Sequence, residues 1–255
     1  ADNFQREEKI YIPKCYRQLS SKKVLTMEFI SGTNIDDSKQ LIQQGLCPES
    51  LAQNGAQLML KQIFEHGFYH ADPHPGNILI LKENTFCFLD YGMMGRLTQK
   101  LKEELAQILF GINEGNAAKV SRALIHLSES DEYINSAKLE NQLDRFLSEY
   151  THQKLHQLDA SQILNDLLRL FYDNQLKMPA DLYLLLKTLV VIQANAKNLD
   201  PDFDMMKHLE PYVKKLIRQH FHPINFIQNL YVTASEFSSF LRDLPQDAHE
   251  IIERI

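Results

Sequence analysis

Three oxygen-bearing side chains lie close together in the sequence near residue 80. Asp72 and Asn77 precede two short apolar runs, and Asp90 follows them directly. Carboxylate and amide oxygens are ligands that Mg²⁺ takes in sites that handle phosphates. Phosphoryl transfer also needs a base or orienting group for the incoming hydroxyl, a role that Asp72 fits, whereas Asn77 and Asp90 fit the role of metal ligands. The residue types therefore favour a phosphate-handling metal site.

The elements around these residues should bring them together. Residues 78–81 and 86–89 are rich in β-formers and flank the polar residues 82–85, which predicts a β-hairpin. A hairpin places its two ends side by side, so the three side chains should converge. Each alone is more often a turn or strand-end residue. The combination, with Gly76 and Gly92 beside it, favours the functional interpretation.

Two histidines alternate with Asp72 and raise the alternative of a zinc hydrolase. His70 and His74 do not have the H-E-x-x-H spacing, and Pro73 and Pro75 exclude a helix at this place. No further cluster of histidine or cysteine supplies the remaining ligands. We therefore expect His70 and His74 to support the loop through hydrogen bonds.

The rest of the chain predicts an α+β fold that is mostly helical. Residues 22–30 are predicted to form a strand that runs into a linker at residues 31–32. Helical periodicity and end signals predict helices at residues 48–66, 98–112, 117–127, 136–152, 161–176 and 179–198, with two or three more before residue 255. The apolar stretch 182–194 is shorter than the ~20 residues of a membrane-spanning helix and contains Lys187, which favours a buried helix.

Composition limits the function classes. The 255 residues are 44% hydrophobic and 24% charged, as in a globular protein, and the net charge of −6 argues against nucleic-acid binding. Three cysteines without C-x-x-C spacing indicate reduced thiols and a cytoplasmic location. The polar, acidic start does not resemble a signal peptide.

The amino-acid sequence of the motif closely resembles that of one protein family. His70-Ala-Asp72 followed by four residues and Asn77 resembles the catalytic loop of protein kinases, and Asp90-Tyr-Gly92 resembles their D-F-G element. His-Ala-Asp-Pro-His-Pro-Gly-Asn together with Leu-Asp-Tyr-Gly-Met-Met-Gly-Arg-Leu is similar to the ABC1/UbiB (AarF, ADCK) family of atypical kinases. The aminoglycoside and choline phosphotransferases share the H-x-D-x-H-P-x-N loop but are not expected to continue in this way after the second aspartate.

The resemblance implies a set of roles. It makes Asp72 the catalytic-loop aspartate, Asn77 and Asp90 the Mg²⁺ ligands, and Met27 and Glu28 the gatekeeper and hinge beside adenine. It implies ATP or ADP as the nucleotide, ATPase or kinase-like chemistry, and support of ubiquinone or related isoprenoid-quinone biosynthesis. The implied partners are quinone-biosynthesis proteins, an isoprenoid lipid or the cytoplasmic side of a membrane.

One departure from the family pattern qualifies the enzyme interpretation. No glycine occurs before Gly32, and the sequence has neither the family's K-x-G-Q element nor a strand lysine for the phosphates. We therefore expect residues 1–33 to be a remnant of the small lobe and hinge, 34–205 the large lobe, and 206–255 a helical extension. On this expectation the chain alone lacks the lysine and loop that bind phosphate.

Two further alternatives stay open. A catalytically inactive scaffold that responds to a nucleotide or lipid would dock other biosynthetic proteins through its helices. A small-molecule phosphotransferase would turn over a soluble alcohol. The amphipathic region 221–244 is compatible with a membrane surface or with a packed helix.

Overall fold

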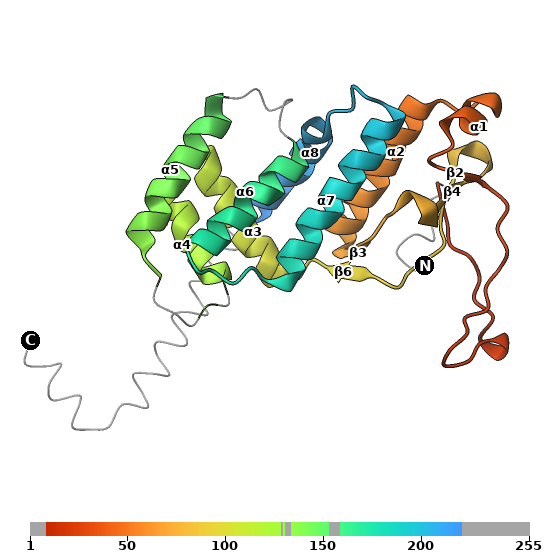
Figure 1. The fold of residues 1–255 in the computed structure, drawn as a ribbon, viewed down its shortest axis with the longest axis horizontal. Coiled ribbons are helices and arrows are strands. Elements are labelled where there is room, and N and C mark those ends of the chain that lie inside the picture. The colour runs from red at the N-terminus through yellow and green to blue at the C-terminus, as the bar shows by residue number, and fades with distance from the viewer. Residues whose placement is uncertain (1–8, 129, 131–133, 153–158, 221–255) are drawn as a thin grey trace, which may run out of the picture.

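A small sheet region is followed by a helical body (Figure 1) in the computed structural model, which describes residues 9–128, 130, 134–152 and 159–220. The strands are β1 (Ile10–Tyr11), β2 (Thr33–Asn34), β3 (Phe68–His70), β4 (Ile78–Ile80), β5 (Phe86–Phe88) and β6 (Met94–Arg96). The helices are α1 (Ser38–Gln43), α2 (Pro48–Lys61), α3 (Gln99–Asn113), α4 (Ala117–Leu127), α5 (Ser136–His152), α6 (Ala160–Asp173), α7 (Ala180–Leu199) and α8 (Met205–His220). The expected α+β, mostly helical fold is confirmed.

Two sheets lie next to each other in the first part of the chain. The larger has the strand order β1-β5-β4-β2. Within it β4 and β5 are antiparallel, with Ile78 opposite Phe88, so the predicted hairpin is confirmed. The second sheet pairs β3 with β6, with His70 opposite Met94. This second pairing was not expected from the sequence, because both strands are only three residues long.

Side-chain caps set most helix boundaries near their predicted positions. The Thr98 hydroxyl accepts a hydrogen bond from the Leu101 amide, and the Asn116 side chain accepts one from the Lys119 amide. Helix α6 ends at Asp173 instead of residue 176. The reason is local: Gln175 has a left-handed backbone with φ of 56°, which a continuing helix cannot accommodate.

Helices α2 and α7 lie side by side and form the wall against which the larger sheet packs (Figure 1). Leu51 and Met59 of α2, Ile192 of α7 and Phe86 of β5 are all buried in this layer. Gly55 lets the Phe86 ring approach, because a Cβ atom there would lie 2.9 Å from its Cε1 atom. The expectation that residues 182–194 form a buried helix is thereby confirmed.

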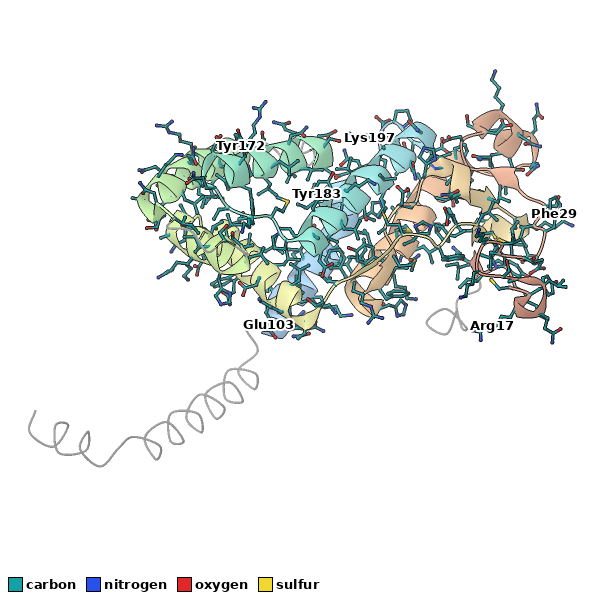
Figure 2. All side chains as sticks on the ribbon, turned by 60° about the horizontal axis from the view of Figure 1, so that its bottom comes forward. Arg17, Phe29, Glu103, Tyr172, Tyr183 and Lys197 are labelled. Atoms are coloured by element: carbon teal, nitrogen blue, oxygen red, sulfur yellow. The ribbon has the colours of Figure 1, made fainter. Side chains whose placement is uncertain are left out.

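The predicted strand at residues 22–30 is wrong. Only Met27 forms a β-bridge, and its partner is Cys15. The backbone hydrogen bonds beside this bridge close a narrow loop and do not continue as a pair of strands. Val24, Leu25 and Phe29 are 60%, 66% and 93% exposed, so their side chains are not buried against any described element. Figure 2 shows Arg17 and Phe29 at the end of the molecule opposite Tyr172. The β-forming residues had the right propensity but lacked a partner strand of sufficient length.

Among the described helices, none has the length and apolar character needed to cross a bilayer. The expected helices beyond residue 220, and with them the amphipathic region 221–244, lie outside the described residues.

Candidate active site

A short irregular loop carries Asp72 out of strand β3. The two prolines at 73 and 75 prevent an α-helix here, and the chain makes a single 3-10 turn over Pro75–Asn77. The His74 amide donates to the Asp72 carbonyl at 2.7 Å, and the Asn77 amide donates to the His74 carbonyl at 2.9 Å. Asp72 and Asn77 are therefore held at opposite ends of one compact loop.

The hairpin then brings Asp90 to the same place. The Leu89 amide donates to the Asn77 carbonyl at 2.9 Å, one step beyond the pair formed by Ile78 and Phe88. Asp90 follows immediately, with an exposed side chain whose Oδ1 atom accepts a hydrogen bond from the Gly92 amide at 2.8 Å. The sequence-based expectation that the hairpin ends carry Asn77 and Asp90 to one spot agrees with these contacts.

A buried histidine joins the two halves of the site. His70 is 2% exposed, and its Nε2 atom lies 2.5 Å from the Asp90 carbonyl oxygen. Its Nδ1 atom lies 3.2 Å from the Asp72 amide nitrogen. A carbonyl oxygen can only accept, so Nε2 carries the hydrogen and Nδ1 accepts from Asp72. The expected supporting role of His70 has this physical form.

The environment of His70 keeps its ring neutral. Burial lowers the pKa of His70, outweighing the carbonyl and the carboxylates of Asp72 and Asp90, which act in the opposite direction. A neutral ring with one hydrogen can donate at one nitrogen and accept at the other, as both contacts require. His74, in contrast, is exposed and uses its Nδ1 atom to accept from the Gly76 amide at 3.2 Å.

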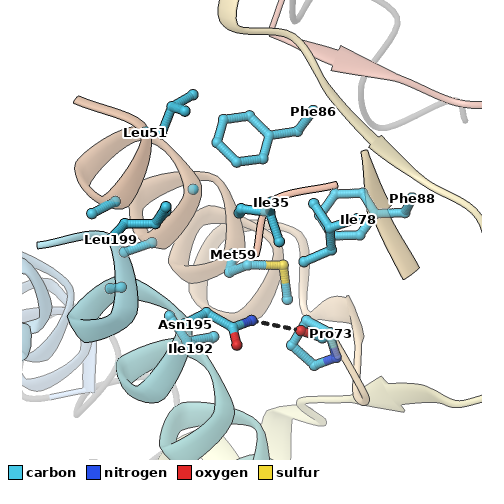
Figure 3. A pocket seen from close by; sticks show the side chains of 14 residues that line it. Ile35, Leu51, Met59, Pro73, Ile78, Phe86, Phe88, Ile192, Asn195 and Leu199 are labelled. Atoms are coloured by element: carbon cyan, nitrogen blue, oxygen red, sulfur yellow. Dashed lines mark hydrogen bonds between the residues drawn. The ribbon is translucent and has the colours of Figure 1, made fainter. Parts of the chain in front are cut away.

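Helix α7 holds the same loop from behind through residues that the sequence did not indicate. Thr188 is fully buried, and its hydroxyl lies 3.1 Å from the Ala71 carbonyl and 2.7 Å from the Leu184 carbonyl. The Asn195 side-chain amide donates to the Pro73 carbonyl at 2.7 Å (Figure 3). These two carbonyls flank Asp72, so α7 fixes the position of the candidate base.

Lys187, on the same helix, reaches the carboxylate itself. Its Nζ atom lies 3.7 Å from Asp72 Oδ1, and the two side chains are 37% and 41% exposed. The sequence offered one faint signal for this residue, a single charge inside an apolar helical stretch. A lysine is unusual in such a stretch, but the sequence does not show which residue its side chain contacts.

The space behind the loop is too small for a ligand. A mostly apolar cavity of about 30 Å³ lies between α2, α7 and the hairpin. Met59, Phe86 and Ile192 are among the residues that line it (Figure 3). This volume is far too small for a nucleotide, and its lining is mostly apolar. Binding would therefore occur on the open side of the loop, where Asp72 and Asp90 are accessible.

Of the two expected hinge residues, Glu28 lines a different hollow from the one behind the loop, and Met27 does not line it. Met27 bridges to Cys15, and the Glu28 carboxylate accepts from the Tyr11 hydroxyl at 2.9 Å and from the Lys14 amide at 3.1 Å. Glu28 also lines an open hollow of about 540 Å³ beside β1 and residues 81–85. Asp72, Asn77 and Asp90 do not line it, so the structure does not join the expected adenine side to the metal side in one cavity.

The donor set suits a hard cation better than zinc. No group of three or more His, Cys, Asp and Glu side chains suited to a metal occurs among the described residues. Asn77 and Asp90 supply one amide and one carboxylate oxygen, which is a fitting set for Mg²⁺ when phosphate oxygens complete the coordination. The Asn77 side chain makes no hydrogen bond to another described residue, so its oxygen is available.

Comparisons with known proteins agree with this arrangement. The model of the ABC1 atypical kinase-like domain matches residues 1–124, and that of the UbiB helical domain matches residues 143–204. The uncharacterized protein sll1770 of Synechocystis is 29% identical over 257 residues, covering 99% of this chain and 44% of that protein. The chloroplastic protein ACTIVITY OF BC1 COMPLEX KINASE 8 of Arabidopsis thaliana is 28% identical over 249 residues, covering 86% of this chain and 33% of that protein.

A solved structure shares the fold. Rv3197 of Mycobacterium tuberculosis, determined in complex with erythromycin, superposes with a TM-score of 0.50 at 17% identity, over 82% of this chain and 54% of that one. The chain spans less than half the length of the curated relatives described above. The two family models match this chain one after the other, and a relative is named as a kinase of the same group, so the chain belongs to the ABC1/UbiB family of atypical kinase-like proteins.

Proposed function

We propose that this protein is a Mg²⁺-dependent ATP-binding protein with ATPase or kinase-like phosphotransfer activity. The observation that carries the proposal is the buried, neutral His70, which hydrogen bonds to the backbone of both Asp72 and Asp90. A single rigid group thereby fixes the spacing between a candidate base and a candidate metal ligand. Phosphoryl transfer depends mainly on such positioning and on charge stabilisation.

Each residue has a distinct part in this proposal. Asn77 and Asp90 would hold Mg²⁺, which neutralises phosphate charge when bound. Asp72 orients the incoming hydroxyl or water and accepts its proton, and its half-exposed carboxylate is accessible for this purpose. Gly92 directs its amide to Asp90 Oδ1, which leaves Oδ2 free to face the ligand. Met27 and Glu28 would lie beside adenine.

Binding and turnover can be separated experimentally. In the full-length protein, Asp90→Ala should abolish Mg²⁺-dependent binding of a fluorescent ATP analogue, because it removes the carboxylate ligand. Asp72→Asn should retain binding but lower turnover by a factor on the order of 100 or more. Asp36→Ala, an exposed aspartate outside the site, is the matched control and should change neither. Unchanged binding in the Asp90→Ala protein would refute the proposal.

The biological role that we propose is support of ubiquinone or another isoprenoid-quinone pathway. Its basis is the role that the resemblance to the ABC1/UbiB family implies; the names of the relatives state only an activity on the BC1 complex. The expected result is a lower quinone content in cells whose only copy of the full gene carries Asp90→Ala. Full quinone content with Asp72→Asn would favour a nucleotide-responsive scaffold over an enzyme.

A further inference from the structure

Lys187 is the one charged residue of α7 between Asp181 and Lys197. Its neighbours on either side are apolar or, in the case of Thr188, buried. A lysine side chain also loses considerable rotamer freedom when it is held in one place. Lys187 nevertheless places its charge 3.7 Å from the candidate base Asp72, which suggests a role for the ammonium group at the site.

The backbone that carries Lys187 is fixed relative to Asp72. Thr188, the next residue, hydrogen bonds to the Ala71 carbonyl, and Asn195, two helical turns further on, hydrogen bonds to the Pro73 carbonyl. These contacts anchor the helix on both sides of Asp72 in the loop. The lysine stem consequently starts from a defined point beside the carboxylate.

The contact with Asp72 leaves hydrogen-bond donors of the Lys187 ammonium group unused. The distance of 3.7 Å from Nζ to Oδ1 exceeds the roughly 2.7–2.9 Å of a charge-assisted hydrogen bond. An ammonium group has three donors, and Asp72 is the only partner of Lys187 that the structure shows among the described residues. Both side chains are partly exposed on the open side of the loop, so these donors remain available to a ligand.

We propose that the Lys187 ammonium binds the non-bridging oxygens of the phosphoryl group that is transferred. This inference rests on the proposed phosphotransfer function. Asp72 must lie next to the attacking oxygen in order to accept its proton, and a cation within 4 Å of Asp72 therefore lies beside the phosphorus under attack. Phosphoryl transfer places negative charge on the equatorial oxygens, where an ammonium group is most effective.

The proposed step transfers the γ-phosphoryl group of ATP to an acceptor hydroxyl or to water. The oxygen of the acceptor hydroxyl or water forms a bond to the γ-phosphorus while its proton passes to the Asp72 carboxylate. The bond from the γ-phosphorus to the β–γ bridging oxygen breaks, and its electron pair leaves with ADP. Lys187 keeps its proton and stabilises the oxygens of the transferred group throughout. Since ADP has no γ-phosphate, Lys187 should distinguish ATP from ADP.

The chain contains a matched control for this lysine. Lys197, also on α7, pairs with Asp159 at 3.4 Å, and the exposed fractions of these side chains, 43% and 40%, resemble those of the Lys187 pair. Asp159 lies at the start of α6 and outside the catalytic loop. A surface ion pair of this kind contributes little to stability. Lys187→Met and Lys197→Met therefore remove the same charge from the same helix at different places.

The experiment measures dissociation constants for Mg²⁺-ATP and Mg²⁺-ADP, together with kcat, in the full-length protein. Lys187→Met should weaken ATP binding roughly tenfold, leave ADP binding within about twofold, and lower kcat on the order of 100-fold. Lys187→Arg should restore most of the preference for ATP. Lys197→Met should change none of these quantities.

Three outcomes would overturn the inference. An unchanged ATP preference and kcat in Lys187→Met would make the pair an ordinary surface contact. Equal weakening of ATP and ADP, with a lower melting temperature, would make Lys187 a structural residue. In both cases the proposed function survives if Asp90→Ala still abolishes binding. Failure of the wild-type protein to bind Mg²⁺-nucleotide would remove the proposed function and this inference together.

Discussion

Gly95 of β6 lies so close to Tyr69 of β3 that a Cβ atom at position 95 would be 2.3 Å from Tyr69 Cζ and 2.6 Å from its hydroxyl oxygen. Tyr69 is fully buried, and burial is the main reason that its pKa is raised to about 12. The next residue of β3 is His70, which hydrogen bonds to the backbone of Asp72 and Asp90, so this close contact lies next to the candidate site.

Substituting Gly95 by alanine should therefore damage both stability and the site. The added methyl group must push β6 away from β3, at a cost of about 3 kcal/mol in the free energy of unfolding. Tyr69→Leu in the same protein removes the ring atoms under the methyl group and should recover part of that loss. Gly45→Ala, with nothing within 4 Å of its Cβ, should cost only about 1 kcal/mol. Chemical denaturation of the wild-type protein, the single variants Gly95→Ala and Tyr69→Leu and their double variant measures the coupling, and strictly additive losses would contradict it.

The His70 ring bridges the Asp72 amide and the Asp90 carbonyl, and we call this pair of contacts the His70 bridge. Removing it should weaken both the fold and the binding of nucleotide. His70→Phe keeps an aromatic ring of similar shape but removes both hydrogen bonds, leaving the Asp72 amide and the Asp90 carbonyl without their partner. We expect a loss of about 2–4 kcal/mol in the free energy of unfolding and a lower affinity for Mg²⁺-nucleotide. Calorimetry and nucleotide titration measure the two effects.

His74→Ala is the control for this prediction. It removes an exposed contact to the Gly76 amide and should cost about 1 kcal/mol or less. Nucleotide affinity that falls equally in both variants would indicate that the loop as a whole, and not the His70 bridge, matters for binding.

Removing the Thr188 hydroxyl should affect turnover more than nucleotide binding. Thr188→Val has almost the same shape but leaves the Ala71 carbonyl without its donor from α7. We expect the free energy of unfolding to fall by about 1–2 kcal/mol. We also expect a reduced kcat with a KM for ATP close to normal, because Asp72 is displaced while Asn77 and Asp90 are not. Steady-state kinetics distinguish the two parameters. Thr98→Ala, which removes only the cap of α3, should cost similar stability without changing kcat.

The cysteines should differ sharply in reactivity. Cys15 and Cys47 are exposed, whereas Cys87 of β5 is buried and its pKa is raised to about 11, mainly by desolvation. Because the thiolate is the reactive form and Cys87 is buried, a thiol reagent should label the two exposed cysteines and leave Cys87 unlabelled, both at pH 7 and at pH 9. Mass spectrometry after treatment with a thiol reagent identifies the labelled positions. Rapid labelling of Cys87 in the native protein would contradict its burial in the hairpin.

The sequence was sufficient to predict those features that local patterns determine. Helical patterning predicted α4 and α5 at their observed bounds, and the two apolar runs around residues 82–85 predicted the hairpin. It also predicted that the loop of Asp72 and Asn77 would lie beside Asp90, because a hairpin requires its ends to be adjacent. The strand expected at 22–30 was wrong because strand formation depends on a partner, which propensity does not reveal.

The contacts from α7 could not have been predicted in the same way. Thr188 and Ala71 are 117 positions apart in the chain, and no periodicity relates them. Threonine in a helix also tends to bond to its own backbone, as Thr188 does with the Leu184 carbonyl. A single sequence therefore gives no sign that a helix so far along the chain supports the candidate base.

The same contacts have a consequence for how the gene can be divided. Residues 1–124 match one family model and residues 143–204 another, which invites expression of the first segment alone as a minimal kinase-like unit. That product would contain Asp72, Asn77 and Asp90 but neither Thr188 nor Asn195, and two backbone carbonyls of its catalytic loop would lose their donors. A segment that keeps both of these contacts therefore extends at least through the end of α7, across the interval between the two matched regions.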